Sequence, residues 1–201
     1  MSDEIVFYHN PRSRAAIAHW MLEEVGAPYR IEHIDFEAGD NRKPEFLKIN
    51  PMGKIPTIMH RGAVITEAPA ILAYLADAFP DAKLAPAVGT TERGSYYRWL
   101  FFGAAAFEPA LMDVMMKREP VTKMAAGWGS YDDVLATLKG ELAQREWLAG
   151  DRFTAADLYI GSELGWAGMF DAPGIKGDPT LDAYVARCTD RAAYRKVNSG
   201  G

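Results

Sequence analysis

The hydrophobic pattern at the start of the chain alternates between strand-like and helix-like periods. Residues 5–8 form a short apolar, β-favouring run that leads into the turn former Asn10, which predicts a buried strand followed by a turn. From Ser13 onward, apolar residues recur at helical spacing until Gly26 supplies a stop. Residues 29–35 predict a second strand, and this strand–helix–strand order favours a parallel crossover.

A predicted hairpin and another helix come next. Residues 55–59 and 63–66 are two β-favouring runs separated by a turn at Gly62. Residues 67–78 place their large apolar side chains on one helical face, and the helix is expected to end before Pro80. The predicted order of elements is therefore βαβ followed by ββα.

Beyond this α/β part the pattern becomes helical throughout. Residues 80–90 contain two prolines and one glycine and show no clear period, which predicts a linker. We therefore expect an α/β domain at residues 1–79 and an all-α domain at residues 91–201. Residues 96–116 carry aromatic and methionine side chains on nearly every side, which predicts a helix buried on several faces. The packed centre of this domain is expected from residues 142–148 and 153–166.

Capping signals mark where three of these helices begin. Ser130 with Asp133, and Thr154 with Asp157, have the spacing of a capping box. Asp178 precedes a proline, which predicts an N-cap followed by the first position of a helix. We interpret Asp157 as structural for this reason.

Composition and charge exclude several classes of protein. The 201 residues are 49% hydrophobic and 24% charged, which is typical of a globular protein. The longest apolar run has 8 residues, at 100–107, too short to cross a bilayer, and a formal charge of -5 without a basic cluster argues against nucleic acid. The single Cys188 excludes an internal disulfide, and the N-terminus lacks the features of a signal peptide, so we expect a cytoplasmic protein. The four histidines show no metal-ligand spacing, and no metal is expected.

Three motifs carry a resemblance to a known family. They are Asn50-Pro51-Met52-Gly53-Lys54-Ile55-Pro56, Thr66-Glu67-Ala68 and Trp147-Leu148-Ala149-Gly150-Asp151-Arg152-Phe153-Thr154-Ala155-Ala156-Asp157. Their order and separation resemble those of bacterial glutathione S-transferases, and the likeness extends over essentially the whole chain. It implies a thioredoxin-like N-terminal domain and an all-helical C-terminal domain. It also implies an enzyme that activates the thiol of glutathione, its co-substrate, and conjugates it to a hydrophobic electrophile.

The resemblance implies where glutathione would bind. Ile55-Pro56 stands where the family carries a cis-proline, so that the backbone N–H and C=O of Ile55 would pair with the cysteinyl part of glutathione like an added strand. Arg14 and Lys54 are expected to contribute further contacts.

The γ-glutamyl end of glutathione is expected at the start of the helix predicted for residues 67–78. Glu67 would take its ammonium group, and the free N–H groups of the helix would attract its carboxylate. A glutamate in a first turn also suits the helix dipole without any ligand. Many relatives place a serine after this glutamate, and Ala68 lacks that hydroxyl. Glutathione then either binds more weakly or is held by the Ala68 N–H alone.

Two residues are candidates for the catalytic contact with the glutathione sulfur. The segment after the first strand contains no cysteine, which disfavours glutathione-dependent reduction or disulfide exchange and favours activation by a hydroxyl. Ser13 is the first candidate, although a serine at a helix start is also a favoured N-cap. Asn10 is the alternative, and Arg12 with Arg14 indicates an anion nearby or a solvated pair of arginines.

The helical half is expected to shape the acceptor site. Candidate lining residues are Tyr97, Phe102 and Met112, although most aromatic and methionine side chains of this stretch belong to the core or to a subunit contact. The family is usually homodimeric, and the aromatic helix gives an apolar seam for a second copy. The alternative function is a non-catalytic binding or scaffold protein that keeps the fold without turnover.

Overall fold

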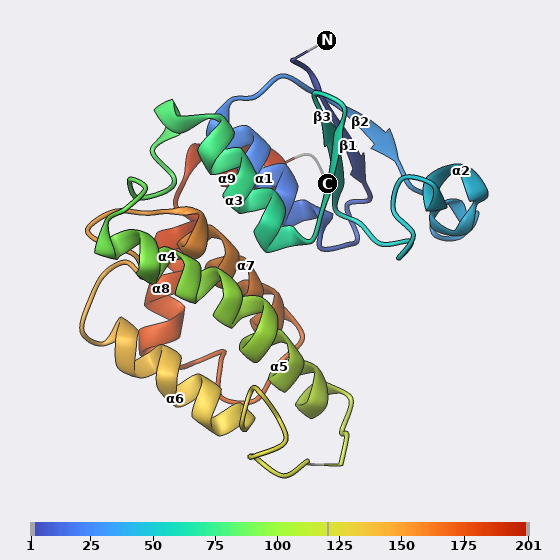
Figure 1. Ribbon diagram of the computed structural model, residues 1–201. Coiled ribbons are helices and arrows are strands. Elements are labelled where there is room, and N and C mark those ends of the chain that lie inside the picture. The colour runs from blue at the N-terminus through green and yellow to red at the C-terminus, as the bar shows by residue number, and fades with distance from the viewer. Residues whose placement is uncertain (1–2, 120, 200–201) are drawn as a thin grey trace. The chain divides into compact units, whose positions relative to one another are not determined.

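The computed structural model describes residues 3–119 and 121–199, and it falls into two compact units (Figure 1). The first, which we call the α/β unit, contains residues up to 83 together with the stretch from residue 192. The second, the helical unit, contains residues 84–191. The division after Lys83 falls inside the expected linker at 80–90. The expected helical domain at 91–201 differs at its end, because the described residues from 192 onward group with the α/β unit.

The α/β unit contains a four-stranded mixed sheet in the order β2-β1-β3-β4. The strand β1 pairs in parallel with β2 and antiparallel with β3, and β3 pairs antiparallel with β4, so the predicted crossover and hairpin are both confirmed. The elements are β1 (Ile5–His9), α1 (Ala15–Val25), β2 (Tyr29–His33), the 3-10 turn η1 (Asp40–Arg42), α2 (Pro44–Leu47), β3 (Thr57–His60), β4 (Ala63–Thr66), α3 (Ala68–Ala78), the 3-10 turn η2 (Pro80–Ala82) and α9 (Ala192–Asn198).

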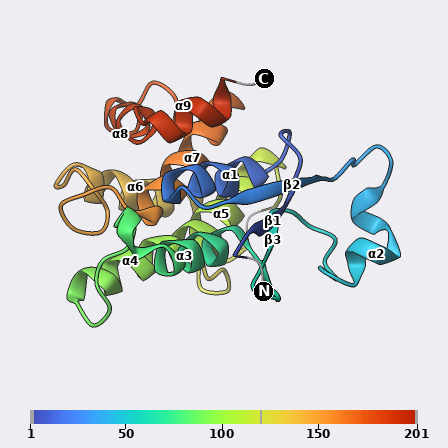
Figure 2. The same cartoon turned by 90° about the horizontal axis from the view of Figure 1, so that it is seen from above.

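The two faces of the sheet are covered differently. Helices α1 and α3 pack together over one face, whereas α2 lies on the side away from them (Figures 1 and 2). Alternation along β1 explains this: Phe7 is fully buried and its ring lies 5.8 Å from that of His19 on α1. The next side chain, Tyr8, points the other way, and its ring lies 5.4 Å from Phe46 of α2.

Helix α9 packs against α1, which is why it groups with the α/β unit. The ring of Tyr194 meets Trp20 edge to face at 4.8 Å, and Lys196 donates to the carboxylate of Glu23 at 2.5 Å. Tyr29 donates to the same carboxylate at 2.5 Å. Burial alone would raise the pKa of Glu23, but these two hydrogen bonds, together with the charges of Lys196 and His19, outweigh it and lower the pKa.

The helical unit is built around α7, of which residues 155–161 are buried throughout. It packs against α4 and α8, and the backbone of Gly103 approaches it so closely that an added Cβ would lie 2.6 Å from the ring of Tyr159. The elements are α4 (Thr91–Phe102), the π-helical η3 (Gly103–Phe107), α5 (Glu108–Met115), α6 (Tyr131–Leu142), α7 (Ala155–Met169) and α8 (Pro179–Thr189).

The predicted capping residues are confirmed at α6, α7 and α8. Ser130 accepts the N–H of Asp133, Thr154 and Asp157 form a complete capping box, and Asp178 accepts two N–H groups of the first turn of α8. The Asp157 carboxylate is fully buried, and it also accepts from the Leu148 N–H.

Two expectations about packing in the helical unit need correction. Residues 142–148 do not form a packed segment: Leu142 and Leu148 are buried, but residues 143–146 are exposed, because α6 ends at Leu142. The helix expected at 96–116 is present as α4, η3 and α5, but it is buried along one face rather than on several. Its buried residues recur every three or four positions, whereas Tyr97 and Phe101 are 39% and 66% exposed. No helix among the described residues is long and apolar enough to span a bilayer.

Candidate active site at one end of the sheet

The register of the sheet brings three predicted segments together. Tyr8 on β1 lies opposite Thr57 on β3, and Thr57 lies opposite Thr66 on β4. Because β3 runs antiparallel to both neighbours, the end of β1, the start of β3 and the end of β4 meet at one end of the sheet. Residues 10–14, 54–56 and 67–68 are attached to that end. The structure thus gathers every residue predicted to contact glutathione at the same end of the sheet.

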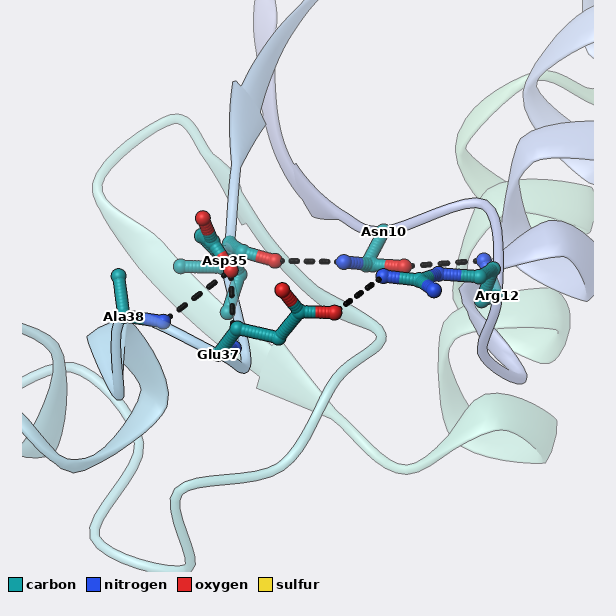
Figure 3. A network of polar contacts seen from close by, with 6 residues as sticks. Asn10, Arg12, Asp35, Glu37 and Ala38 are labelled. Carbon is teal, nitrogen blue, oxygen red and sulfur yellow. Dashed lines mark hydrogen bonds and ion pairs between the residues drawn. The ribbon is translucent and has the colours of Figure 1, made fainter.

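Asn10 and Ser13 form a hydrogen-bonded turn between β1 and α1, and Figure 3 shows the contacts of the Asn10 side chain. The amide of Asn10 is buried, and it donates to the Ile34 carbonyl at 2.8 Å and accepts the Arg12 N–H at 2.9 Å. Ser13 donates its hydroxyl to the Asn10 carbonyl at 2.7 Å and accepts the Ala15 N–H at 3.1 Å. Helix α1 begins two residues later than Ser13, because this turn precedes it.

Arg12 lies at the exposed tip of the same turn. Its guanidinium forms an ion pair of 3.2 Å with Glu37, and both side chains are open to solvent (Figure 3). The loop that carries Glu37 is held by Asp35, whose carboxylate accepts the N–H groups of Glu37 and Ala38. Arg14 takes the N-cap position of α1 with a half-buried side chain. The sequence analysis named both arginines as candidates for contact with an anion, but it did not predict that Glu37 pairs with Arg12.

The second segment of the site is the turn that precedes β3. The Ile55-Pro56 peptide bond is cis, as the resemblance implied. Pro56 is buried, Ile55 is half-buried and Lys54 is exposed. Gly53 has a φ of 63°, and a Cβ there would lie 2.7 Å from the Asn41 carbonyl oxygen, so this position requires glycine.

The third segment is the sharp passage from β4 into α3. Glu67 occupies the N-cap position with φ 65° and ψ 119°, a conformation that residues with a Cβ rarely adopt. Such strained positions concentrate at functional sites. The Glu67 side chain does not cap α3, so the N–H groups of Ala68 and Ala70 at its start point outward with the positive end of the helix dipole. Glu67 itself is exposed. This end of α3 can receive a carboxylate and an ammonium group side by side.

The acceptor candidates all lie in the helical unit. Tyr97 is 39% exposed, and its hydroxyl accepts a hydrogen bond of 2.8 Å from the buried Arg93. Phe102 is half-buried and meets Trp99 edge to face at 5.1 Å, and Met112 is half-buried in α5. These contacts leave part of each candidate side chain open to solvent.

Other titratable groups are explained by packing. The described residues contain no group of three or more histidine, cysteine, aspartate or glutamate side chains arranged to hold a metal ion. Burial raises the pKa of the Cys188 thiol, so this cysteine is an inert part of the helical unit. Burial, together with repulsion from His19 and His33, lowers the pKa of His9 to about 4, so His9 is neutral at pH 7.

Comparison with known proteins gives the class first. The descriptions "Glutathione S-transferase, N-terminal domain" and "Glutathione S-transferase, C-terminal domain" match residues 4–77 and 111–192. A solved sphingomonad glutathione S-transferase in complex with glutathione superposes with a TM-score of 0.77 at 32% identity, over 96% of this chain and 97% of that one. A glutathione transferase from Methylococcus capsulatus gives a TM-score of 0.80 at 29% identity over 97% of both chains. The architecture is thus a thioredoxin-like domain followed by a helical domain.

Curated relatives agree with this class. The glutathione S-transferase hmp2 of Hypomyces subiculosus is 30% identical over 168 residues, which cover 77% of this chain and 78% of that protein. GstA of Escherichia coli O157:H7 is 25% identical over 190 residues, 92% of each chain. The chain therefore belongs to the glutathione S-transferase family, whose members are transferases that conjugate glutathione.

Proposed function

We propose that this protein binds reduced glutathione at the end of its sheet and transfers it, as the thiolate, to a hydrophobic electrophile. The observation that carries the proposal is the convergence of the three segments, with a strained Glu67 beside a helix N-terminus that its own side chain does not cap. In this proposal Glu67 binds the ammonium of the γ-glutamyl group and the Ala68 N–H binds its carboxylate. The backbone of Ile55 pairs with the cysteinyl part, and Arg14, Lys54 and Pro56 complete the site.

Ser13 is the proposed donor to the glutathione sulfur. It has one O–H, which now points at the neutral carbonyl of Asn10, and a thiolate is the stronger acceptor because the hydrogen bond is charge-assisted. The Ala15 N–H on the Ser13 oxygen polarises the hydroxyl in the same direction. Asn10, the alternative, already uses both ends of its amide, so its proposed role is to hold the turn.

Substitution of Ser13 tests this assignment. A charge-assisted hydrogen bond contributes about 1.5–3 kcal/mol, so Ser13→Ala is expected to raise the thiol pKa of bound glutathione by about 1–2 units. The pKa is measured from the ultraviolet absorbance of the thiolate across a pH series. If it stays unchanged in Ser13→Ala but moves in Asn10→Ala, the sulfur contact belongs to Asn10 instead.

The binding step is tested by calorimetric titration of the purified protein with reduced glutathione at pH 7 and fixed salt. We expect saturable binding of one glutathione per chain, and about 10-fold or greater weakening in Glu67→Gln, because a hydrogen bond between charged groups is lost. Glu45→Gln is the matched control, since Glu45 is an exposed glutamate in the first turn of α2. Absence of binding by the unmodified protein would overturn the proposed function.

Turnover separates the enzyme from a scaffold. We expect conjugation of an aryl halide by the unmodified protein, whereas binding of glutathione without turnover of any electrophile would favour the non-catalytic alternative. The proposed acceptor contacts are Tyr97, Phe102 and Met112, and their replacement is expected to change the KM for the electrophile more than the affinity for glutathione.

A homodimer in the cytoplasm completes the proposal. Phe101 is 66% exposed on α4 and supplies an apolar side chain for contact with a second copy. Phe101→Glu is expected to shift the sedimentation coefficient from dimer to monomer. The single cysteine, Cys188, is buried and reduced, which suits a reducing compartment.

A further inference from the structure

The turn before β3 is held from inside by two buried polar side chains. Asn50 is 3% exposed, and its amide donates to the Lys54 carbonyl at 2.8 Å and to the Thr57 hydroxyl at 3.1 Å. Thr57 is fully buried and donates its own hydroxyl to the same Lys54 carbonyl at 2.9 Å. The amide oxygen of Asn50 accepts the Met52 N–H at 3.1 Å. All the hydrogen-bonding groups of these two side chains thus act on one short turn.

The Lys54 carbonyl is the point on which this network converges. Its oxygen accepts from both Asn50 and Thr57, so it is fixed toward the interior of the turn. The peptide between Lys54 and Ile55 is trans and planar, and a carbonyl and the N–H that follows it then point in opposite directions. The Ile55 N–H is therefore directed away from the two buried side chains.

The Ile55 N–H has no partner within the described part of the chain. Among residues 3–119 and 121–199, none accepts a hydrogen bond from it, although the neighbouring turn is dense in hydrogen bonds. Ile55 lies at the end of the sheet that also carries Ser13 and Glu67. A peptide held in one orientation by buried donors, with its N–H open, is prepared for an external carbonyl acceptor.

We propose that Asn50 and Thr57 are positioning residues for ligand binding. Neither touches glutathione. They hold the Lys54–Ile55 peptide so that the Ile55 N–H meets a carbonyl of the ligand without first losing rotational freedom. This inference rests on the proposed function and adds to it the groups that orient one of its backbone contacts.

The test compares Thr57→Val with Thr57→Ser and Thr137→Val. Thr57→Val keeps the shape of the side chain and removes the hydroxyl, whereas Thr57→Ser keeps the hydroxyl and removes the methyl group. Thr137→Val is the matched control, because Thr137 donates to the Asp133 carbonyl at 2.7 Å on the exposed side of α6. The measured quantities are the Kd of glutathione, the Kd of S-methylglutathione and the melting temperature.

S-methylglutathione separates the backbone contact from the chemistry of the thiol. It retains the peptide carbonyls of glutathione but cannot form a thiolate. We expect Thr57→Val to weaken both ligands about tenfold, Thr57→Ser to bind within about threefold of the unmodified protein, and Thr137→Val to leave both Kd values unchanged. Equal loss of affinity in Thr57→Ser and Thr57→Val would assign the effect to methyl packing and overturn the proposal, as would unchanged affinity in Thr57→Val.

A second measurement needs no substituted protein. In the unmodified chain, the amide proton of Ile55 is expected to shift downfield and to exchange more slowly with solvent when S-methylglutathione saturates the protein. An unchanged Ile55 resonance at saturation overturns the positioning role while leaving glutathione binding intact. Absence of binding by the unmodified protein is a different result, because it refutes the proposed function itself.

Discussion

The buried carboxylate of Asp157 gives a prediction about stability that can be worked through from its contacts. Its two oxygens accept four hydrogen bonds of 2.9–3.0 Å, from the Leu148 N–H, the Thr154 N–H and hydroxyl, and the Tyr184 hydroxyl. Asp157, Thr154, Leu148 and Tyr184 are all fully buried. Replacement of Asp157 by alanine therefore leaves several donors in the interior of the helical unit without an acceptor.

The size of the effect follows from the number of those donors. A buried donor left without a partner costs about 1–3 kcal/mol, and removal of the carboxylate recovers part of its own desolvation free energy. We expect Asp157→Ala to lower the free energy of unfolding by about 3–5 kcal/mol, a large share of the roughly 5–15 kcal/mol that stabilises a typical protein. For a chain of this length that is a fall in Tm of about 6–20 °C.

Asp133 supplies the matched control, because it holds the same position in the first turn of α6 as Asp157 does in α7, although the spacing predicted as a capping box is only half formed there. Its side chain is 56% exposed, and its partners are Ser130 and Lys123 at the surface. Asp133→Ala is expected to cost less than about 1 kcal/mol, since water replaces the lost acceptor. Urea unfolding followed by tryptophan fluorescence and by circular dichroism measures both variants. Equal losses in Asp157→Ala and Asp133→Ala would refute the reasoning, because burial would then have no bearing on the cost.

Three further predictions concern the α/β unit. The pKa of His9 is about 4 in the folded protein, below that of an unfolded histidine, so the free energy of unfolding is expected to fall by up to about 3 kcal/mol as the pH drops from about 6.5 to about 4. Urea titrations at pH 7 and 4.5 on the unmodified protein and on His9→Phe measure this fall, and an equal fall in both proteins would contradict the prediction. Gly53→Ala places a Cβ 2.7 Å from the Asn41 carbonyl oxygen at a positive φ, and is expected to lower the free energy of unfolding by about 1–3 kcal/mol in urea titrations. An unchanged unfolding midpoint would show that the turn can shift to make room. Tyr194→Ala removes the edge-to-face contact with Trp20, and is expected to speed proteolytic cleavage within α9 at least severalfold; cleavage at the original rate would mean that the contact does not hold the helix.

Much of the fold could be predicted because the local spacing of apolar residues indicates most of its strands and helices. The parallel pairing of β1 with β2 follows from the strand–helix–strand order, and the Asp178-Pro179 helix start follows from two adjacent residues. The grouping of α9 with the α/β unit could not be predicted in this way. It depends on contacts such as Lys196 with Glu23, which are 173 residues apart in the sequence, and no local pattern carries that information.

The site was predictable as a set of segments but not as a set of hydrogen bonds. The motifs singled out Ser13, Ile55 and Glu67, and the structure places all three segments at the same end of the sheet. The sequence does not say which acceptor receives the single O–H of Ser13, since a hydroxyl rotates to suit its surroundings. The sequence did not predict the hydrogen bond from Asn50 to the Lys54 carbonyl, because an asparagine before a proline is an ordinary turn former. Only the folded turn shows that the Asn50 amide donates to this carbonyl.

In the proposed function the backbone makes several of the contacts, so glutathione binding is compatible with Ala68 at the position where the family resemblance led us to expect serine. The Ala68 N–H needs no particular side chain to bind a carboxylate, because its direction is set by α3 and by the left-handed conformation of Glu67. The Ile55 N–H is likewise directed by the Lys54 peptide rather than by its own side chain. Side-chain identity then matters most at the positions that set these directions or carry charge, which are Asn50, Thr57 and Glu67. A search for related sites should therefore weigh those three positions above Ile55 and Ala68, although the latter two lie at the proposed ligand contacts.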